Sequence, residues 1–200
     1  MEFEIDNEKI EESFKKIASN LMNDYLLMAG DKSYRICELE FYYSSKSHQD
    51  PYIHGHQLQG KMGKWYFHGS GLDLTFGTEN ILASILIRAI YNLDYKKYIY
   101  GPLNSVTELL GNLPGIFGGD FSLRLEPDYS CKIENKLDTP IEAPRIGLNV
   151  DKDLYRDYFK KPYRFLVMPK EKHNGKESII TAMEEKKDKS KEEIKKLWNT

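Results

Sequence analysis

The sequence is short of the features that mark secreted disulfide-stabilised domains and membrane spans. Its two cysteines, Cys37 and Cys131, are too few for a disulfide framework or a four-cysteine zinc site. No apolar run approaches the roughly 18 residues of a transmembrane helix. Residues 1–6 are acidic overall and lack the apolar segment of a signal peptide. We therefore expect an intracellular, cytoplasmic protein that makes no membrane contact.

An excess of basic charge is also missing. The chain has 29 Lys and Arg against 31 Asp and Glu, a net charge of −2. Residues 170–200 hold nine basic and seven acidic residues, which leaves 20 basic and 24 acidic residues, or −4, in residues 1–169. Phosphate contacts dominate the affinity of proteins for nucleic acids. The composition therefore predicts no general nucleic-acid-binding surface on residues 1–169, the body of the protein.

What the chain does have is enough apolar residues for one folded domain. It has 200 residues, of which 40% are hydrophobic and 12% aromatic. We predict an α+β fold with a curved, mainly antiparallel sheet and short flanking helices over residues 1–169. Residues 170–200 are predicted to form a charged linker and a C-terminal helix that packs on the body, is solvated, or binds a partner.

The pattern of apolar residues gives the expected elements. Helical spacing predicts a first helix over residues 7–22, capped by Asp6 or Asn7, and further helices over 103–110 and 151–159. Shorter apolar or aromatic runs between turn residues predict strands. These cover residues 25–28, 34–43, 64–68, 72–76, 83–90, 121–125, 145–149 and 163–168.

Two acidic residues lie within the second predicted strand. Alternation places Glu38 and Glu40 on the same face, with Tyr42 beside them. One interpretation is a carboxylate positioned to activate water. The other is an exposed polar face on an edge strand.

The predicted loop that follows is rich in histidine. His48, Asp50, His54 and His56, with His68 further on, are residue types that bind zinc or non-haem metals. Their spacing is irregular and they include no cysteine, so we expect surface or hydrogen-bonded histidines and no metal.

Arg88 lies in the apolar run of residues 84–90. If buried, it needs a carboxylate, carbonyl or phosphate partner; otherwise it reaches solvent at the strand end. Gly69-Ser70-Gly71 is too short for a phosphate-binding loop.

Taken in order, these segments resemble the alkyladenine (3-methyladenine) DNA glycosylase family over about residues 10–168. The similarity begins with Glu38-Leu39-Glu40-Phe41-Tyr42, which corresponds to the family's E-x-E-A-Y strand. The remaining matches are Asp50-Pro51-Tyr52-Ile53-His54, Gly63-Lys64-Trp65-Tyr66-Phe67-His68, Leu86-Ile87-Arg88-Ala89, Gly101-Pro102, Ala143-Pro144-Arg145-Ile146-Gly147-Leu148 and Lys161-Pro162-Tyr163-Arg164-Phe165-Leu166.

The resemblance implies an N-glycosidase of base excision repair that flips a modified base into a pocket. It implies that Glu40 activates the attacking water and that Arg88 holds this water and a nearby phosphate. Glu38 is expected to be structural. The implied partner is DNA or another nucleic acid, without metal or other cofactor, and we expect a monomer. The implied base-binding residues are Tyr42 and His54, with Tyr66 or His68 as the third.

Gly69-Ser70-Gly71 stands where the family has an intercalating side chain. The family's asparagine that rejects guanine-like bases has no clear counterpart, although Asp73, Thr75 and Asn80 lie nearby. We therefore expect weak, salt-dependent duplex binding or a substrate that is already unpaired. Any local basic rim should be drawn from Lys61, Lys64, Arg88 and Lys161.

Two other functions are compatible with the residues alone. The first is a non-catalytic module that binds a nucleotide, nucleic acid or protein through the same cleft. The second is a metal-dependent hydrolase that uses the histidines.

Overall fold

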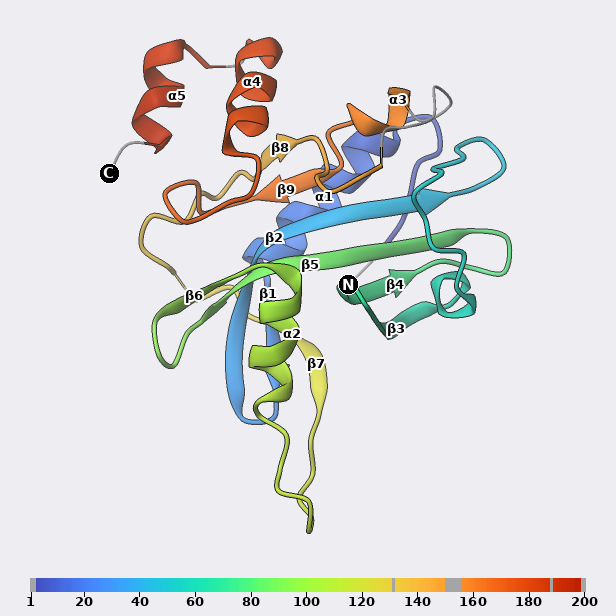
Figure 1. Cartoon of the computed structure of the whole chain (residues 1–200), viewed down its shortest axis with the longest axis vertical. Coiled ribbons are helices and arrows are strands. Elements are labelled where there is room, and N and C mark those ends of the chain that lie inside the picture. The colour runs from blue at the N-terminus through green and yellow to red at the C-terminus, as the bar shows by residue number, and fades with distance from the viewer. Residues whose placement is uncertain (1–2, 131, 150–155, 188, 199–200) are drawn as a thin grey trace.

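The computed structural model describes residues 3–130, 132–149, 156–187 and 189–198 and shows the expected α+β fold (Figure 1). Within these residues, nine strands form one curled antiparallel sheet. The main path of the sheet is β3-β4-β5-β2-β1-β7; β6 pairs with β5, while β9 pairs with β2 and with β8. None of the described helices has the length and apolar character needed to cross a bilayer.

The long strand β2 (Lys32–Ser44) is the centre of the sheet. It forms a hairpin with β1 (Tyr25–Ala29) and pairs with β5 (Leu82–Asn92) along most of its length. Gly30 turns the hairpin with φ +61°, a conformation that favours glycine. The remaining strands are β3 (Met62–His68), β4 (Gly71–Phe76), β6 (Lys97–Tyr100), β7 (Leu123–Pro127), β8 (Ile141–Ala143) and β9 (Arg164–Leu166).

One strand prediction is wrong, and one strand was not predicted. The predicted strand over residues 145–149 is wrong, because the strand in this region is β8, which ends before Pro144. Proline cannot donate to a strand ladder, and Gly147 then turns the chain with φ +72°. Strand β6, which extends the edge beside β5, was not predicted.

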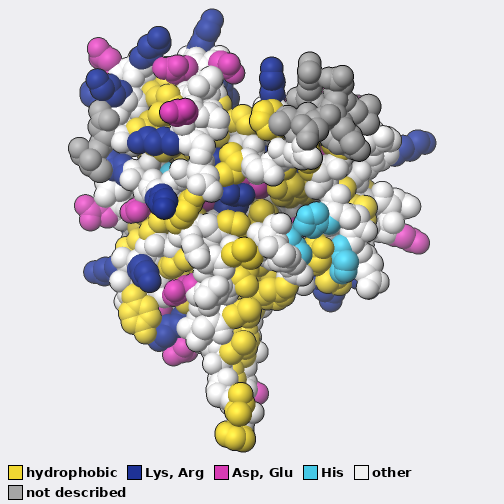
Figure 2. Space-filling model, in the orientation of Figure 1, with side chains coloured by type: hydrophobic (Ala, Val, Ile, Leu, Met, Phe, Trp, Pro, Cys, Tyr) yellow, Lys and Arg dark blue, Asp and Glu magenta, His cyan; other side chains and the backbone are white. Residues whose placement is uncertain are grey.

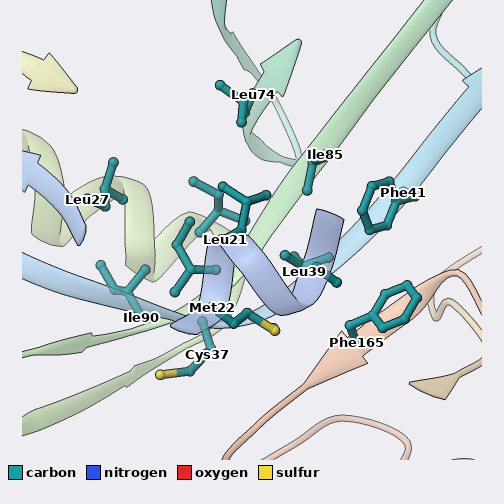
Figure 3. Close-up of a cluster of buried hydrophobic side chains, with 14 of the residues drawn as sticks. Leu21, Met22, Leu27, Cys37, Leu39, Phe41, Leu74, Ile85, Ile90 and Phe165 are labelled. Atoms are coloured by element: carbon teal, nitrogen blue, oxygen red, sulfur yellow. The ribbon is translucent and has the colours of Figure 1, made fainter. Parts of the chain in front are cut away.

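Helix α1 (Ile10–Asn23) packs its apolar side onto the sheet. Phe14 stacks on Phe41 of β2 with ring centroids 4.3 Å apart. Figure 3 shows Leu21 and Met22 among strand residues of the same core. The predicted cap is wrong: Lys9 is the N-cap, without a side-chain cap bond. Asn7 lies too far upstream, and its Oδ1 accepts a hydrogen bond from Tyr43.

Two further helices lie on the body. Helix α2 (Pro102–Leu110) has proline in its first turn, as expected. Its following loop extends away from the body (Figures 1 and 2). In this loop Ile116 and Phe117 are 93% and 99% exposed. Helix α3 (Arg156–Phe159) falls within the predicted helix 151–159, whose residues 151–155 lie outside the described part of the chain.

The C-terminal extension contains two helices where the sequence predicted one. Helices α4 (Lys176–Lys186) and α5 (Lys191–Trp198) are separated at Lys187, which has φ +56°. Both helices bury apolar residues in a small second core with β8 and β9. This core contains Ile141, Ala143, Leu166, Ile179, Met183, Ile194 and Trp198.

Gly77 offers a test of the packing around β4. A Cβ atom at this position would meet the backbone carbonyl oxygens of Gln59 and Ile81 at distances that real Cβ atoms do not show. Because backbone cannot move aside cheaply, we expect Gly77→Ala to lower the free energy of unfolding by about 2 kcal/mol or more.

The matched control is Gly69→Ala, where a Cβ atom meets nothing within 4 Å. Urea unfolding should place this variant within about 0.5 kcal/mol of wild type. Equal stability of the two variants would contradict the packing around Gly77.

Candidate functional site

A cleft of about 600 Å³ opens where the far half of β2 meets β5 and the β3–β4 turn. Segments distant in sequence form its walls, including the N-terminus of α2 and the stretches around residues 146–149 and 174–175. Figure 2 shows histidine side chains grouped on this face of the molecule. Its lining includes Tyr42, Tyr52, His54, Gln59, His68, Ser70, Asp73, Leu86, Arg88, Pro102, Ile146, Leu148, Asn149 and Asn174.

Glu40 lies beneath this cleft and is fully buried. Its Oε1 accepts a hydrogen bond from the backbone N–H of Ile146 at 3.0 Å. Its Oε2 accepts one from the Tyr42 hydroxyl at 3.0 Å and one from Arg88 Nη1 at 3.1 Å. All three donor residues line the cleft. Glu40 is therefore held in one orientation by groups that separate it from the cleft space.

Glu38 is the second carboxylate on this face, and Arg88 bridges the two. Arg88 Nε donates to Glu38 Oε1 at 2.9 Å, and Arg164 Nε of β9 donates to the same oxygen at 2.9 Å. His173 Nδ1 lies 2.7 Å from Oε2. Both carboxylates are buried, so the alternative of an exposed polar face on an edge strand is wrong.

The charges around Glu38 decide its protonation state. Burial alone would raise the pKa of this carboxyl, but the hydrogen bond from His173 and the two arginine charges outweigh burial and hold the pKa at about 2. Burial likewise disfavours the charged form of Arg88, yet the two carboxylates raise its pKa. Glu38 and Arg88 are therefore both charged at neutral pH.

A second buried ion pair supports the ring of Tyr42. Arg145 binds Asp50 through two hydrogen bonds of 2.6 and 3.0 Å, and it donates to the carbonyl of Phe41 at 3.0 Å. Its guanidinium lies 4.6 Å from the centroid of the Tyr42 ring. Burial raises the pKa of the Tyr42 hydroxyl well above its usual range, and so does the charge of Glu40. Tyr42 is therefore a neutral hydrogen-bond donor.

Three histidine rings lie around the ring of Tyr66. The His56 ring stacks on Tyr66 at 4.4 Å, while the rings of His54 and His68 lie 6.0 and 4.8 Å from it. His54 and His68 line the cleft, but Tyr66 is not among the lining residues. Of the predicted base-binding residues, Tyr42, His54 and His68 therefore share one cavity.

Hydrogen bonds fix the tautomer of His68. Its Nδ1 accepts from the backbone N–H of Ser70 at 3.2 Å, so Nε2 carries the proton and donates to Asp73 Oδ1 at 2.9 Å. Asp73 Oδ2 in turn accepts from Ser84 at 2.7 Å. Neither nitrogen of His68 is left to act as a base, and the ring presents a fixed surface to the cleft.

The histidine loop does not converge on one point. Asp50 binds Arg145, and His48 packs between Tyr158 and Tyr163, away from the cleft lining. Among the described residues, no group of three or more His, Cys, Asp or Glu side chains is placed to hold a metal ion. Burial lowers the pKa of both His48 and His54.

No protein-family model matches the chain. Among curated proteins, the chain is similar to "Uncharacterized protein L759" of Acanthamoeba polyphaga mimivirus. The two are 27% identical over an alignment of 194 residues, and the match covers 78% of this chain and 87% of the viral protein.

Three residues that hold the site together were not predicted from the sequence: Arg145, Arg164 and His173. Arg164 carried the same signal as Arg88, a charged residue between apolar neighbours in a strand. Arg145 was quoted only as part of a motif. No local pattern marked His173, because it lies in a polar segment far from β2 in sequence.

The lowered pKa of Glu38 predicts acid sensitivity. A carboxyl with a pKa of about 2 in the folded state and roughly 4.5 unfolded stabilises the protein at neutral pH. This contribution, about 3 kcal/mol at most, is lost as the pH falls from about 5 towards 2. We expect Glu38→Gln to be less stable than wild type at neutral pH and to lose less stability on acidification.

Urea unfolding at several pH values between about 6 and 3 gives the slope of the free energy of unfolding against pH for wild type and for Glu38→Gln. Other carboxylates titrate in both proteins and cancel in the comparison. Parallel slopes would show that Glu38 is not held ionised by its partners.

Proposed function

We propose that the protein is an N-glycosidase of the alkyladenine-glycosylase type, acting on a modified base in a nucleic acid. The observation that carries this proposal is the position of Glu40. It lies on the E-x-E strand, beneath a cleft large enough for a nucleobase, and three groups that line the cleft orient its carboxylate.

The chemistry follows from this arrangement. Glu40 Oε2 already accepts two hydrogen bonds, whereas Oε1 accepts the single N–H of Ile146. Oε1 therefore has the more basic lone pair, and we assign it the proton of the attacking water. Arg88 holds the Glu40 carboxylate in place through its Nη1. The faces of Tyr42, His54 and His68 provide stacking surfaces for a flipped base.

One observation favours the alternative of a non-catalytic binding module. The Glu40 side chain has no accessible surface in this conformation, so the backbone at Ile146 and the side chains of Tyr42 and Arg88 would have to admit the water. In such a module, Glu40 would serve only to hold Tyr42 and Arg88 in place. Only the N-glycosidase would release a base from a nucleic acid, so an assay of base release distinguishes it from the binding module.

Glu40→Gln tests the catalytic assignment. The amide keeps the shape of the side chain but cannot accept the water proton, so we expect base release to fall by roughly 10²–10⁴-fold. The structure adds a cost that the sequence did not indicate. Loss of the charge leaves Arg88 with Glu38 alone, so we also expect a lower free energy of unfolding, by about 1–3 kcal/mol.

Release of abasic sites from oligonucleotides carrying different modified bases provides the assay, at a temperature where the variant is folded. The control is Glu126→Gln, the same substitution at a half-exposed residue of β7 paired with Arg124. A Glu40→Gln variant that retains full activity would move the role of base to another residue.

The surroundings of the cleft predict a preference for unpaired substrates. The β3–β4 turn presents Gly69 and Ser70, which have no side chain large enough to fill the gap left by a flipped base. Arg88 is held by two carboxylates, and Lys161 pairs with Glu11. Unpaired bases cost less to extrude, so we expect tighter binding to single strands than to matched duplexes.

Binding to matched single- and double-stranded oligonucleotides across a salt series measures this preference. Duplex affinity should be weak and should fall steeply with salt, because exposed lysines such as Lys61 and Lys64 would supply the contacts to phosphates. Tight duplex binding that hardly changes with salt would contradict the prediction.

A further inference from the structure

The segment that joins β9 to α4 passes under the cleft wall and places one histidine in the charge network. The His173 side chain is fully buried, although its neighbours Asn174 and Gly175 are exposed and line the cleft. Its ring lies near Tyr98 of β6 and Trp198 of α5, with centroids 6.0 and 6.1 Å away. The C-terminal extension therefore contributes both to the wall of the cleft and to the charges beneath it.

The hydrogen bonds of His173 require two ring protons. Nε2 lies 2.7 Å from the carbonyl oxygen of Met168, which can only accept, so Nε2 carries a hydrogen. Nδ1 lies 2.7 Å from Glu38 Oε2. Since Glu38 is ionised, it also only accepts, and Nδ1 must carry a hydrogen as well. His173 is thus an imidazolium that brings a positive charge to Glu38.

Glu38 connects His173 to Arg88, and Arg88 in turn binds Glu40. Its Oε2 is bound by His173, while its Oε1 is bound by Arg88 and Arg164. Arg88 uses Nε for Glu38 and Nη1 for Glu40, so the guanidinium is held at two points. Without His173, Oε2 loses its charged partner, and the carboxylate can rotate away from the position that fixes Arg88.

We infer that His173 is a positioning residue for Glu40, acting through Glu38 and Arg88. The catalytic part of this inference rests on the proposed glycosidase function. It assigns the C-terminal extension a role in the chemistry of the site beyond covering β8 and β9.

The test is His173→Gln, which keeps a hydrogen-bond donor but removes the positive charge. We expect kcat for base release to fall by roughly 10- to 100-fold, because a small displacement of the reacting carboxylate is enough for such a loss. KM should stay within about threefold, because His173 does not line the cleft. Unchanged kcat, or a loss confined to KM, would overturn the inference.

The matched control is His48→Gln. His48 is also largely buried and contacts Tyr163, but it makes no bond to Glu38, Arg88 or Glu40. Both variants lose a buried imidazole, so a general loss of stability affects both. Only His173→Gln should lower kcat at a temperature where both are folded; an equal loss of kcat in the two variants would overturn the inference.

Two NMR measurements do not depend on enzymatic activity. In the wild type, ¹⁵N shifts should show both ring nitrogens of His173 protonated at neutral pH. The Nε–H of Arg88, bound to Glu38, should exchange with solvent at least tenfold faster in His173→Gln and unchanged in His48→Gln. A wild-type His173 with one unprotonated nitrogen, or unchanged exchange of Arg88, would overturn the inference.

These measurements separate the two proposals. Suppose that the wild-type protein releases no base from any oligonucleotide, but that His173 is doubly protonated and the Nε–H of Arg88 exchanges faster in His173→Gln. That result would refute the glycosidase alone. Base release that is unaffected by His173→Gln would refute the positioning role alone.

Discussion

The buried ion network between β2, β5 and β9 is the constraint on which the site depends. Two carboxylates, Glu38 and Glu40, lie with Arg88, Arg164 and His173 in the interior of the protein. An isolated buried charge would cost several kcal/mol, so each of these groups requires its partners to be placed by the fold. The central position of β2 follows from this requirement, because β5 and β9 bring the arginines from either side.

The strand pairing of β2 brings these charged residues together. Its first half pairs with β1 and its second half with β9 on the same edge, while β5 follows the opposite edge. The register with β5 is interrupted on both sides of Glu38. Such irregularities re-aim side chains, and here Glu38 and Glu40 both reach Arg88. The segment after β9 then closes the cluster with His173, which is hydrogen-bonded to Glu38 although the two residues are 135 positions apart in sequence.

Sequence patterns predicted the parts of this structure that depend on local order. Alternation identified β2 and placed Glu38 and Glu40 on one face, and the apolar run around Arg88 indicated that a buried arginine needs a partner. Which partner it takes depends on the register of two strands 50 residues apart, which no local pattern contains. The three-residue strand β8 was missed for the same reason, since a strand this short owes its existence to tertiary pairing. His173 could not be predicted because its neighbours in sequence are polar and its partners are Glu38 of β2 and Met168, which follows β9.

The distribution of charge also indicates how a ligand would lie. Arg88 is the only cation among the cleft-lining residues that the structure describes, and two carboxylates already bind it. A phosphate inside the cleft would compete with Glu38 and Glu40 and would face Asp73, so the interior opposes anions. The ring faces of Tyr42, His54 and His68 have no such conflict with a neutral or positively charged heterocycle. A bound nucleotide would therefore place its base inside and its phosphates at the rim, which is the arrangement that base flipping requires.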